Sequence, residues 1–185
     1  MDAQQAERVL VGLQVTAHSS LGAVALQTGG LLVDDGWLRI LGSGCARMQR
    51  DLVGWNNLGG EHRLPGALLV ADDAVGGFFA INGGAFAGES GNVFYRAPEC
   101  GDWEDMERGY SGFLAWAFTG DLQVYYDEAR WDEWREDSKV FAPDRATHIW
   151  PPLGTKGPPT SARSRREIPV EQMWTFIDDF WRQVR

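Results

Sequence analysis

A chain of 185 residues is long enough for one domain with a full hydrophobic core and too short for two domains of ordinary size. Nine tryptophans and nine phenylalanines, within a hydrophobic content of 44%, exclude a wholly disordered chain, because each buried aromatic removes about 150 to 250 Å² from water. The formal net charge of −9 argues against a protein whose main task is to bind the phosphate backbone of nucleic acids, and it favours a basic partner.

The cysteines and the first residues indicate the compartment. Cys45 and Cys100 match no zinc-ligand or redox spacing, so reduced thiols in the cytoplasm are the simpler expectation. The opening MDAQQAERVLVGL lacks the basic start and cleavage site of a leader, and no apolar run approaches the ~18 residues of a membrane span. We expect a soluble, cytoplasmic protein with neither a nucleic acid nor a membrane as its partner.

The N-terminal third changes from a helical to a strand pattern. Apolar residues at helical spacing predict an amphipathic helix over residues 3–14. Short apolar runs separated by Gly-Gly, Asp-Asp-Gly and Gly-Ser-Gly then predict strands over residues 23–26, 31–33 and 37–41. Residues 45–65 have weak helical spacing and then a polar loop, which predicts a surface crossover.

The middle of the chain carries the clearest strands. ALLVA (67–71) and GFFAI (77–81) are apolar at every position, as expected at the centre of a sheet, whereas NVFYRA (92–97) alternates, as expected nearer an edge. GDWEDM (101–106) is a candidate for a further short strand.

Helical spacing returns after the strands. Residues 110–134 predict two helices, or one helix bent at Gly120, with Ser111 and Asp121 as N-caps. The Pro-, Gly- and Ser-rich segment 142–169 predicts a long irregular excursion. Residues 170–184 predict an amphipathic C-terminal helix that packs through Trp174, Ile177 and Trp181.

The order of these elements defines the expected fold. A helix, then strands in hairpin succession, then helices predict a single α+β domain over residues 1–185. Its antiparallel sheet should contain about five or six strands with flanking helices.

Motifs for metals and nucleophilic catalysis are absent from the sequence. The three histidines are scattered singly, without HExxH and without a cysteine partner. Gly-Ser-Gly at residues 42–44 lacks the third glycine of a dinucleotide loop, and there is no GxSxG elbow or Walker sequence. We therefore expect no metal, no cofactor and no catalytic residues.

Two aspartate doublets are the most informative acids: Asp34 with Asp35, and Asp72 with Asp73. Adjacent side chains of a strand point to opposite faces, so a doublet reaches one pocket only where the backbone turns. Acids on a turn can ligate Mg²⁺ or Ca²⁺, yet aspartate also favours turns because it hydrogen-bonds its own backbone. We interpret the second doublet first as the solvated turn of a hairpin, and second as an active site.

The stretch from ALLVADDAVGGFFAINGG to GYSGFLAWAFTGDL resembles the C-terminal half of the SUKH superfamily. The matching segments, in order, are Leu68–Ala71, Asp72–Gly77, Phe78–Ile81, Gly91–Tyr95 and Ser111–Ala117. The resemblance implies a SUKH-like α+β binding domain, and many such domains are bacterial immunity proteins that neutralise a toxin by contact. The N-terminal segment and the proline-rich segment depart from that pattern. TGGLLVDDGWLRILGSG together with GYSGFLAWAFTGDL is similar, more narrowly, to an uncharacterised bacterial family of domains of unknown function.

Two classes of function follow. The first is a non-enzymatic binding domain for protein–protein interaction, of the toxin-immunity type, with a basic protein such as a toxin as its partner. The second is a small enzyme or a divalent-metal-dependent ligand binder that uses one of the aspartate doublets. For the first class, hairpin turns at one end of a meander predict a partner-binding surface of Asp34, Asp35, Asp72, Asp73, Asp102 and Trp103. The oligomeric state is open.

Overall fold

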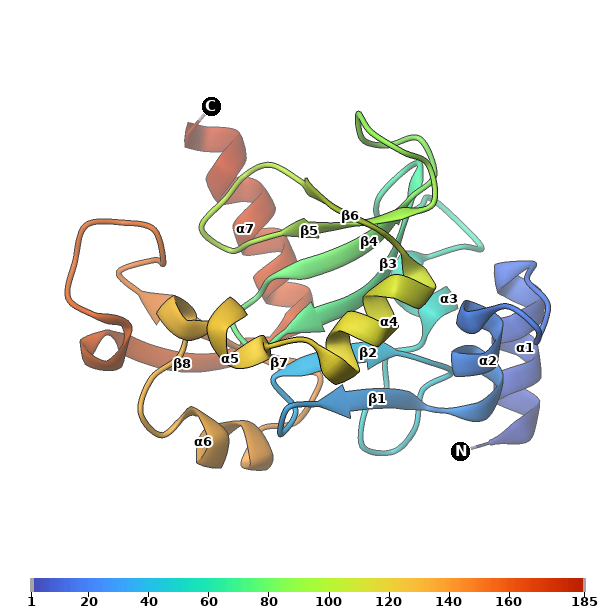
Figure 1. Cartoon of the computed structure of the whole chain (residues 1–185), viewed down its shortest axis with the longest axis horizontal. Helices are drawn as coiled ribbons and strands as arrows, with labels where there is room; N and C mark the ends of the chain where they lie inside the picture. Colours follow the sequence, from blue (N-terminus) through green and yellow to red (C-terminus); the bar gives the residue numbers. More distant parts are fainter. Residues whose placement is uncertain (1, 185) are drawn as a thin grey trace.

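The computed structural model describes residues 2–184, with the side chains of residues 2–181. Six strands form one antiparallel sheet in chain order (Figure 1). They are β1 (Gly30–Val33), β2 (Leu38–Leu41), β3 (Ala67–Asp73), β4 (Phe78–Asn82), β5 (Asn92–Arg96) and β6 (Glu104–Gly109). The predicted α+β class and antiparallel sheet are confirmed.

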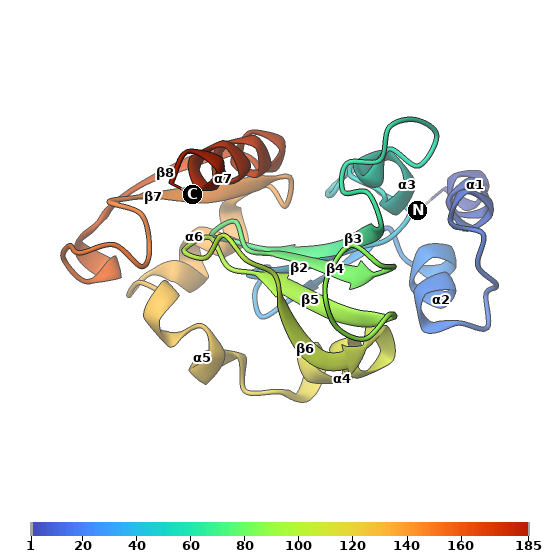
Figure 2. The same cartoon turned by 90° about the horizontal axis from the view of Figure 1, so that it is seen from above.

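The helices cover this sheet on both faces. They are α1 (Ala3–Leu13), α2 (Ser20–Gln27), α3 (Leu52–Asn56), α4 (Tyr110–Thr119), α5 (Leu122–Tyr125), α6 (Trp134–Val140) and α7 (Val170–Val184), with short 3-10 helices η1 (Asp127–Ala129) and η2 (Thr160–Ala162). Figure 2 shows α3 and α7 on one face, α4 and α5 on the other, and α1 and α2 at one end. A second sheet pairs β7 (Arg145–Trp150) with β8 (Ser164–Pro169) beside α7.

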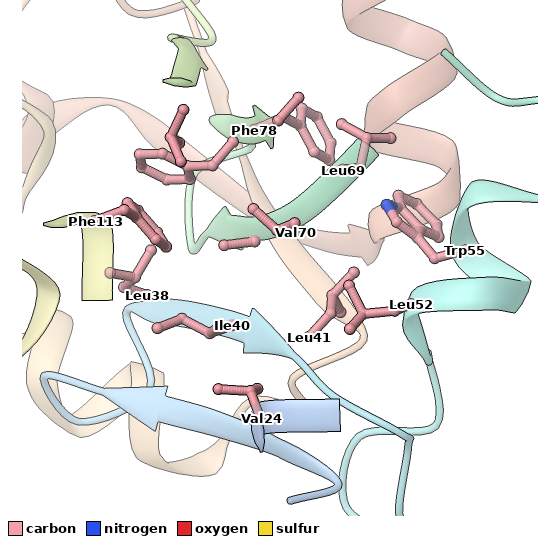
Figure 3. Packing of buried hydrophobic residues seen from close by; sticks show 14 of the residues in the cluster. Val24, Leu38, Ile40, Leu41, Leu52, Trp55, Leu69, Val70, Phe78 and Phe113 are labelled. Atoms are coloured by element: carbon pink, nitrogen blue, oxygen red, sulfur yellow. The ribbon is translucent and has the colours of Figure 1, made fainter. Parts of the chain in front are cut away.

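The main core follows from strands that are apolar at every position. Consecutive residues of β4 face opposite layers, as the pleat requires. Phe78 packs edge-on against Trp174 of α7, with 4.9 Å between ring centroids, whereas Phe79 packs at 5.1 Å against Phe113 of α4. Figure 3 shows the same arrangement around Val70, with Trp55 and Phe113 on either side. The two central strands are therefore buried on both faces.

A second, aromatic cluster lies beneath the β7–β8 hairpin. Its centre is Trp37, whose ring centroid lies 5.2 to 5.6 Å from those of Tyr126, Trp131 and Trp134. The guanidinium of Arg130 lies 3.8 Å from the ring centroid of Trp134 and pairs with Asp34. This cluster connects the β1–β2 turn to the chain around α5 and α6.

The structure corrects one strand. Residues 23–26 lie in α2, where the Ser19 side chain caps the helix by accepting from the Gly22 amide. A short apolar run does not distinguish a buried strand from a buried helix by periodicity, and the cap decides here.

Two further expectations differ in detail. The N-cap of α4 is Gly109 rather than Ser111, whereas Asp121 caps α5 as predicted by accepting from the Val124 amide. Residues 142–169 are not an irregular excursion throughout, because they contain the paired strands β7 and β8. Most of the Pro, Gly and Ser residues of this segment lie in the connection between the two strands, which leaves the strands free to pair.

Candidate functional site

Asp72 is the centre of a buried ionic network. Its side chain is 1% exposed, and both of its oxygens are taken by arginines. Arg39 Nε donates to Oδ1 at 2.7 Å, and an Arg50 terminal nitrogen donates to Oδ2 at 2.5 Å. Arg50 also pairs with Asp144 at 2.8 Å. The network joins β2 and β3 to the two loops that carry Arg50 and Asp144.

Asp73 is buried on the opposite face of β3. Its Oδ1 accepts from the amides of Val75 (3.1 Å) and Gly77 (2.7 Å), and its Oδ2 accepts from the Tyr95 hydroxyl at 2.8 Å. Burial raises the pKa of the Asp73 carboxyl above its ordinary value, and these donors oppose the rise. A Cβ on Gly77 would lie 2.2 Å from Asp73 Oδ2, so only glycine fits this turn.

The second doublet is therefore not the solvated turn that the sequence suggested. β3 continues through Asp73, and the turn to β4 comes after it. Two adjacent aspartates at the end of a buried strand look like turn residues in the sequence, because their partners Arg39, Arg50 and Tyr95 are distant along the chain.

The other expected surface residues lie at two separate edges of the sheet. Asp34 and Asp35 occupy left-handed positions in the β1–β2 turn, where Asp34 pairs with Arg130 and Asp35 lies 3.5 Å from Arg135. Asp102 is exposed in the β5–β6 connection. Trp103, beside it, is half-buried against Phe86, with 4.9 Å between ring centroids. The six residues thus do not form one continuous surface, because β1 and β6 are opposite edges and the second doublet is buried.

A cleft of about 690 Å³ opens beside the buried Asp73–Tyr95 pair. Its lining comes from Val75 in the β3–β4 turn, from β5 and its connection to β6, and from residues 123–129 of α5 and η1. This volume is in the range of small-molecule and side-chain sites. We call it the tyrosine–carboxylate cleft.

The lining of this cleft is acidic. It includes four carboxylates and, among the described residues, no lysine, arginine or histidine. The carboxylates are Glu99, Glu104, Asp127 and Glu128. Within the part of the chain that the structure describes, none of the four forms an ion pair, in contrast to Asp34, Asp35 and Asp72. Their charge is therefore available to a ligand.

The carboxylates repel one another. Partial removal from water raises the pKa of the Glu99 carboxyl above its ordinary value, and the charges of Asp73 and Glu128 raise it further. A cation in the cleft would reverse the electrostatic part of this shift.

Three tyrosines complete the lining: Tyr95, Tyr125 and Tyr126. Burial raises the pKa of each hydroxyl above its ordinary value, and the charge of Asp73 adds to the rise, so all three are neutral near pH 7. Tyr126 is 3% exposed, and its buried hydroxyl interacts with the Asp73 carboxylate.

The sequence did not reveal this cleft. Its acids come from residues 99–104 and from η1, which are more than 20 residues apart in the chain, and Tyr125 and Tyr126 lie in a segment whose spacing predicts only a helix. The local signal is the run YYDE at residues 125–128, where two tyrosines precede two acids.

Neither a metal-binding cluster nor a membrane-spanning helix occurs among the described residues. No three His, Cys, Asp or Glu side chains gather there in a way that would hold a metal ion. None of the described helices combines the length and the apolar character that crossing a membrane requires.

The chain has relatives among known proteins. A family model described as "Protein of unknown function DUF2625" matches residues 1–173. YbfG, an uncharacterised protein of Escherichia coli K12, is 42% identical over 172 residues, which cover 91% of this chain and 77% of the relative. An uncharacterised protein of Haemophilus influenzae Rd is 39% identical over 154 residues, which cover 77% of this chain and 68% of the relative. No solved structure matches the chain.

Proposed function

The chain belongs to the DUF2625 family, whose function is unknown, and we propose that it is a non-enzymatic binding domain that holds a cationic group of a basic partner in the tyrosine–carboxylate cleft. The observation that carries this proposal is the lining itself, in which, among the described residues, four carboxylates form no ion pair and no side chain is basic.

Electrostatics supports a cation as the ligand. One carboxylate at 4 Å attracts a cation by only about 1 kcal/mol in water, and by about 4 kcal/mol where the surroundings are less polar. Four carboxylates around one cavity therefore decide the sign of the ligand's charge, although each one alone would be weak. A bound cation also relieves the repulsion that raises the pKa of Glu99.

The rim of the cleft supports a protein as the partner. Val124 is 72% exposed and Tyr125 is 43% exposed, and both line the cavity. Exposed apolar and tyrosine side chains next to a charged pocket are typical of protein–protein interfaces, in which they supply the buried area. The acids would steer a basic partner toward this rim.

The proposal that the partner is a toxin rests on the resemblance to SUKH domains. The chain resembles SUKH domains, many of which are immunity proteins that bind toxins directly, and a basic toxin in the cytoplasm fits an acidic cleft. The alternative of an enzyme or metal binder built on the aspartate doublets has less support, because both oxygens of Asp72 are already held by Arg39 and Arg50.

The test uses hexalysine as a basic probe. In amide NMR titrations at low salt, hexalysine should shift the signals of residues 123–129, and the affinity should fall as salt is added. Replacing two cleft acids in the variant Glu99→Gln/Glu128→Gln should weaken binding by about fivefold or more.

The matched control changes the net charge equally at a different place. Glu133 and Glu136 are exposed acids outside the cleft lining, and neither forms an ion pair among the described residues. The variant Glu133→Gln/Glu136→Gln should change the affinity by less than about twofold, because exposed charges outside the lining do not contact the ligand and are screened by salt. Equal effects of the two double variants would contradict the proposal, since binding would then follow net charge alone.

A further inference from the structure

The proposed function leaves open which cationic group the cleft accepts, and the candidates are a primary ammonium, a guanidinium and a quaternary ammonium. We infer that the cleft selects a guanidinium, as carried by an arginine side chain of the partner. This inference rests on the proposed function and adds the chemical class of the ligand.

The acidic side chains of the lining require a ligand with N–H donors. An ionised carboxylate only accepts hydrogen bonds, and the lining has four of them. The Tyr95 hydroxyl donates its single proton to Asp73, so toward any other group its oxygen can only accept. A quaternary ammonium has no N–H group, so the exposed carboxylates would stay bonded to water and add no hydrogen bond to the ligand.

The tyrosine rings do not form an open cage. The centroid of Tyr125 lies 4.8 Å from that of Tyr126, 5.9 Å from that of Tyr95 and 4.9 Å from that of Trp116. A quaternary ammonium is held by rings that surround an empty space, whereas these rings pack on one another. The geometry therefore argues against trimethylated or choline-like cations.

A guanidinium matches both the carboxylates and the exposed tyrosine ring of the lining. Its five N–H donors lie in a plane and can reach carboxylates that come from two chain segments, residues 99–104 and η1. Its flat face can stack on the part of the Tyr125 ring that stays exposed. An ammonium has three donors and no flat face, so it would pair with the acids but contact the ring over a smaller area than a stacked guanidinium.

The experiment compares three probes of equal charge: N-acetyl-arginine amide, N-acetyl-lysine amide and N-acetyl-trimethyllysine amide. Each carries one positive charge, so differences in affinity report the head group. In amide NMR titrations of the full chain, the arginine probe should bind about fivefold more tightly than the lysine probe. The trimethyllysine probe should bind most weakly.

Variants separate stacking from charge. Tyr125→Leu removes the exposed ring and keeps every carboxylate, so the arginine and lysine probes should become nearly equal. Phe118→Leu changes a 57% exposed aromatic on α4 outside the cleft lining and should keep the arginine preference. Thermal melts of both variants show whether they fold.

The outcomes distinguish this inference from the proposed function. If the lysine or trimethyllysine probe binds at least as tightly as the arginine probe, guanidinium selection is overturned while cation binding stands. If hexalysine binds and none of the three probes does, the inference is likewise overturned. If neither hexalysine nor any probe binds, the proposed function itself fails.

Discussion

Asp72 and Asp73 are neighbours in the sequence with different electrostatic situations. Two arginines neutralise Asp72 inside the protein, whereas the donors to the Asp73 carboxylate among the described residues are all neutral. A buried carboxylate between two guanidiniums holds both cations in place, because removing it leaves charge uncompensated in a dry environment. The two residues therefore respond differently to the same substitution.

For Asp72, we predict a large loss of stability. Asp72→Asn should lower the free energy of unfolding by about 3 to 5 kcal/mol, because Arg39 and Arg50 lose their shared counter-charge. Urea denaturation measures this change, with the exposed Asp132→Asn as the control. The network would have no structural role if both variants unfolded at the same urea concentration.

For Asp73, we predict an effect that depends on pH. Because burial raises the pKa of Asp73 in the folded protein, its contribution to stability is full below the unfolded pKa and is lost as pH rises through the folded pKa. Asp73→Asn removes this titration, and an asparagine oxygen can still accept from Val75 and Gly77. The variant should therefore gain stability relative to the wild type from pH 4 to pH 7.

Urea denaturation of both proteins across that range checks the sign. A stability difference that stays constant with pH, or that moves against the variant as pH rises, would show that the folded pKa of Asp73 is not raised.

At this scale the sequence could locate the doublets but not their environment. An aspartate followed closely by glycine is typical both of a solvated turn and of a strand end whose carboxylate closes the turn that follows. The side chains that decide between the two, Arg39, Arg50 and Tyr95, lie 22 to 33 residues away along the chain.

At the scale of elements, α7 is attached to the sheet by its aromatic stripe. Trp174 packs edge-on against Phe78, with 4.9 Å between centroids, and Met173 and Ile177 are buried beside it. The helix packs over the start of β4 on this face, and Figure 2 shows it on the same side of the sheet as α3.

We therefore predict that Trp174→Ala lowers the free energy of unfolding by about 3 kcal/mol, because it removes a large aromatic from a packed site. Trp150→Ala is the control, since Trp150 is 59% exposed at the end of β7. Thermal or urea unfolding measures both, and similar midpoints for the two variants would refute the role assigned to Trp174.

The sequence predicted the elements with a strong period and missed those without one. Strands that are apolar at every position, and an amphipathic helix of four turns, have sequence patterns that fit few other secondary structures. The helix α2 has eight residues of mostly small or apolar type, and the β7–β8 hairpin depends on pairing across a Pro-rich connection. The local sequence pattern does not determine either element, because both depend on contacts with distant parts of the chain.

Across the whole molecule, which has a net charge of −9, some acids are paired with arginines and others are not. Asp34, Asp35 and Asp72 are paired with arginines, so much of the charge that appeared available in the sequence is already neutralised. The acids of the tyrosine–carboxylate cleft are not paired among the described residues. A basic partner could be proposed from composition alone, but the place where it binds required the structure, because chain segments brought together by the fold form the cleft.

Carboxyl-carbon NMR of Glu99, with and without saturating hexalysine, tests whether the cleft binds a cation. Proton and cation compete for the same carboxylate, so each must weaken the binding of the other. We predict that the pKa of Glu99 lies above the ordinary glutamate value in the free protein and falls when hexalysine is bound. An ordinary pKa in the free protein that hexalysine leaves unchanged would show that no cation binds beside Glu99.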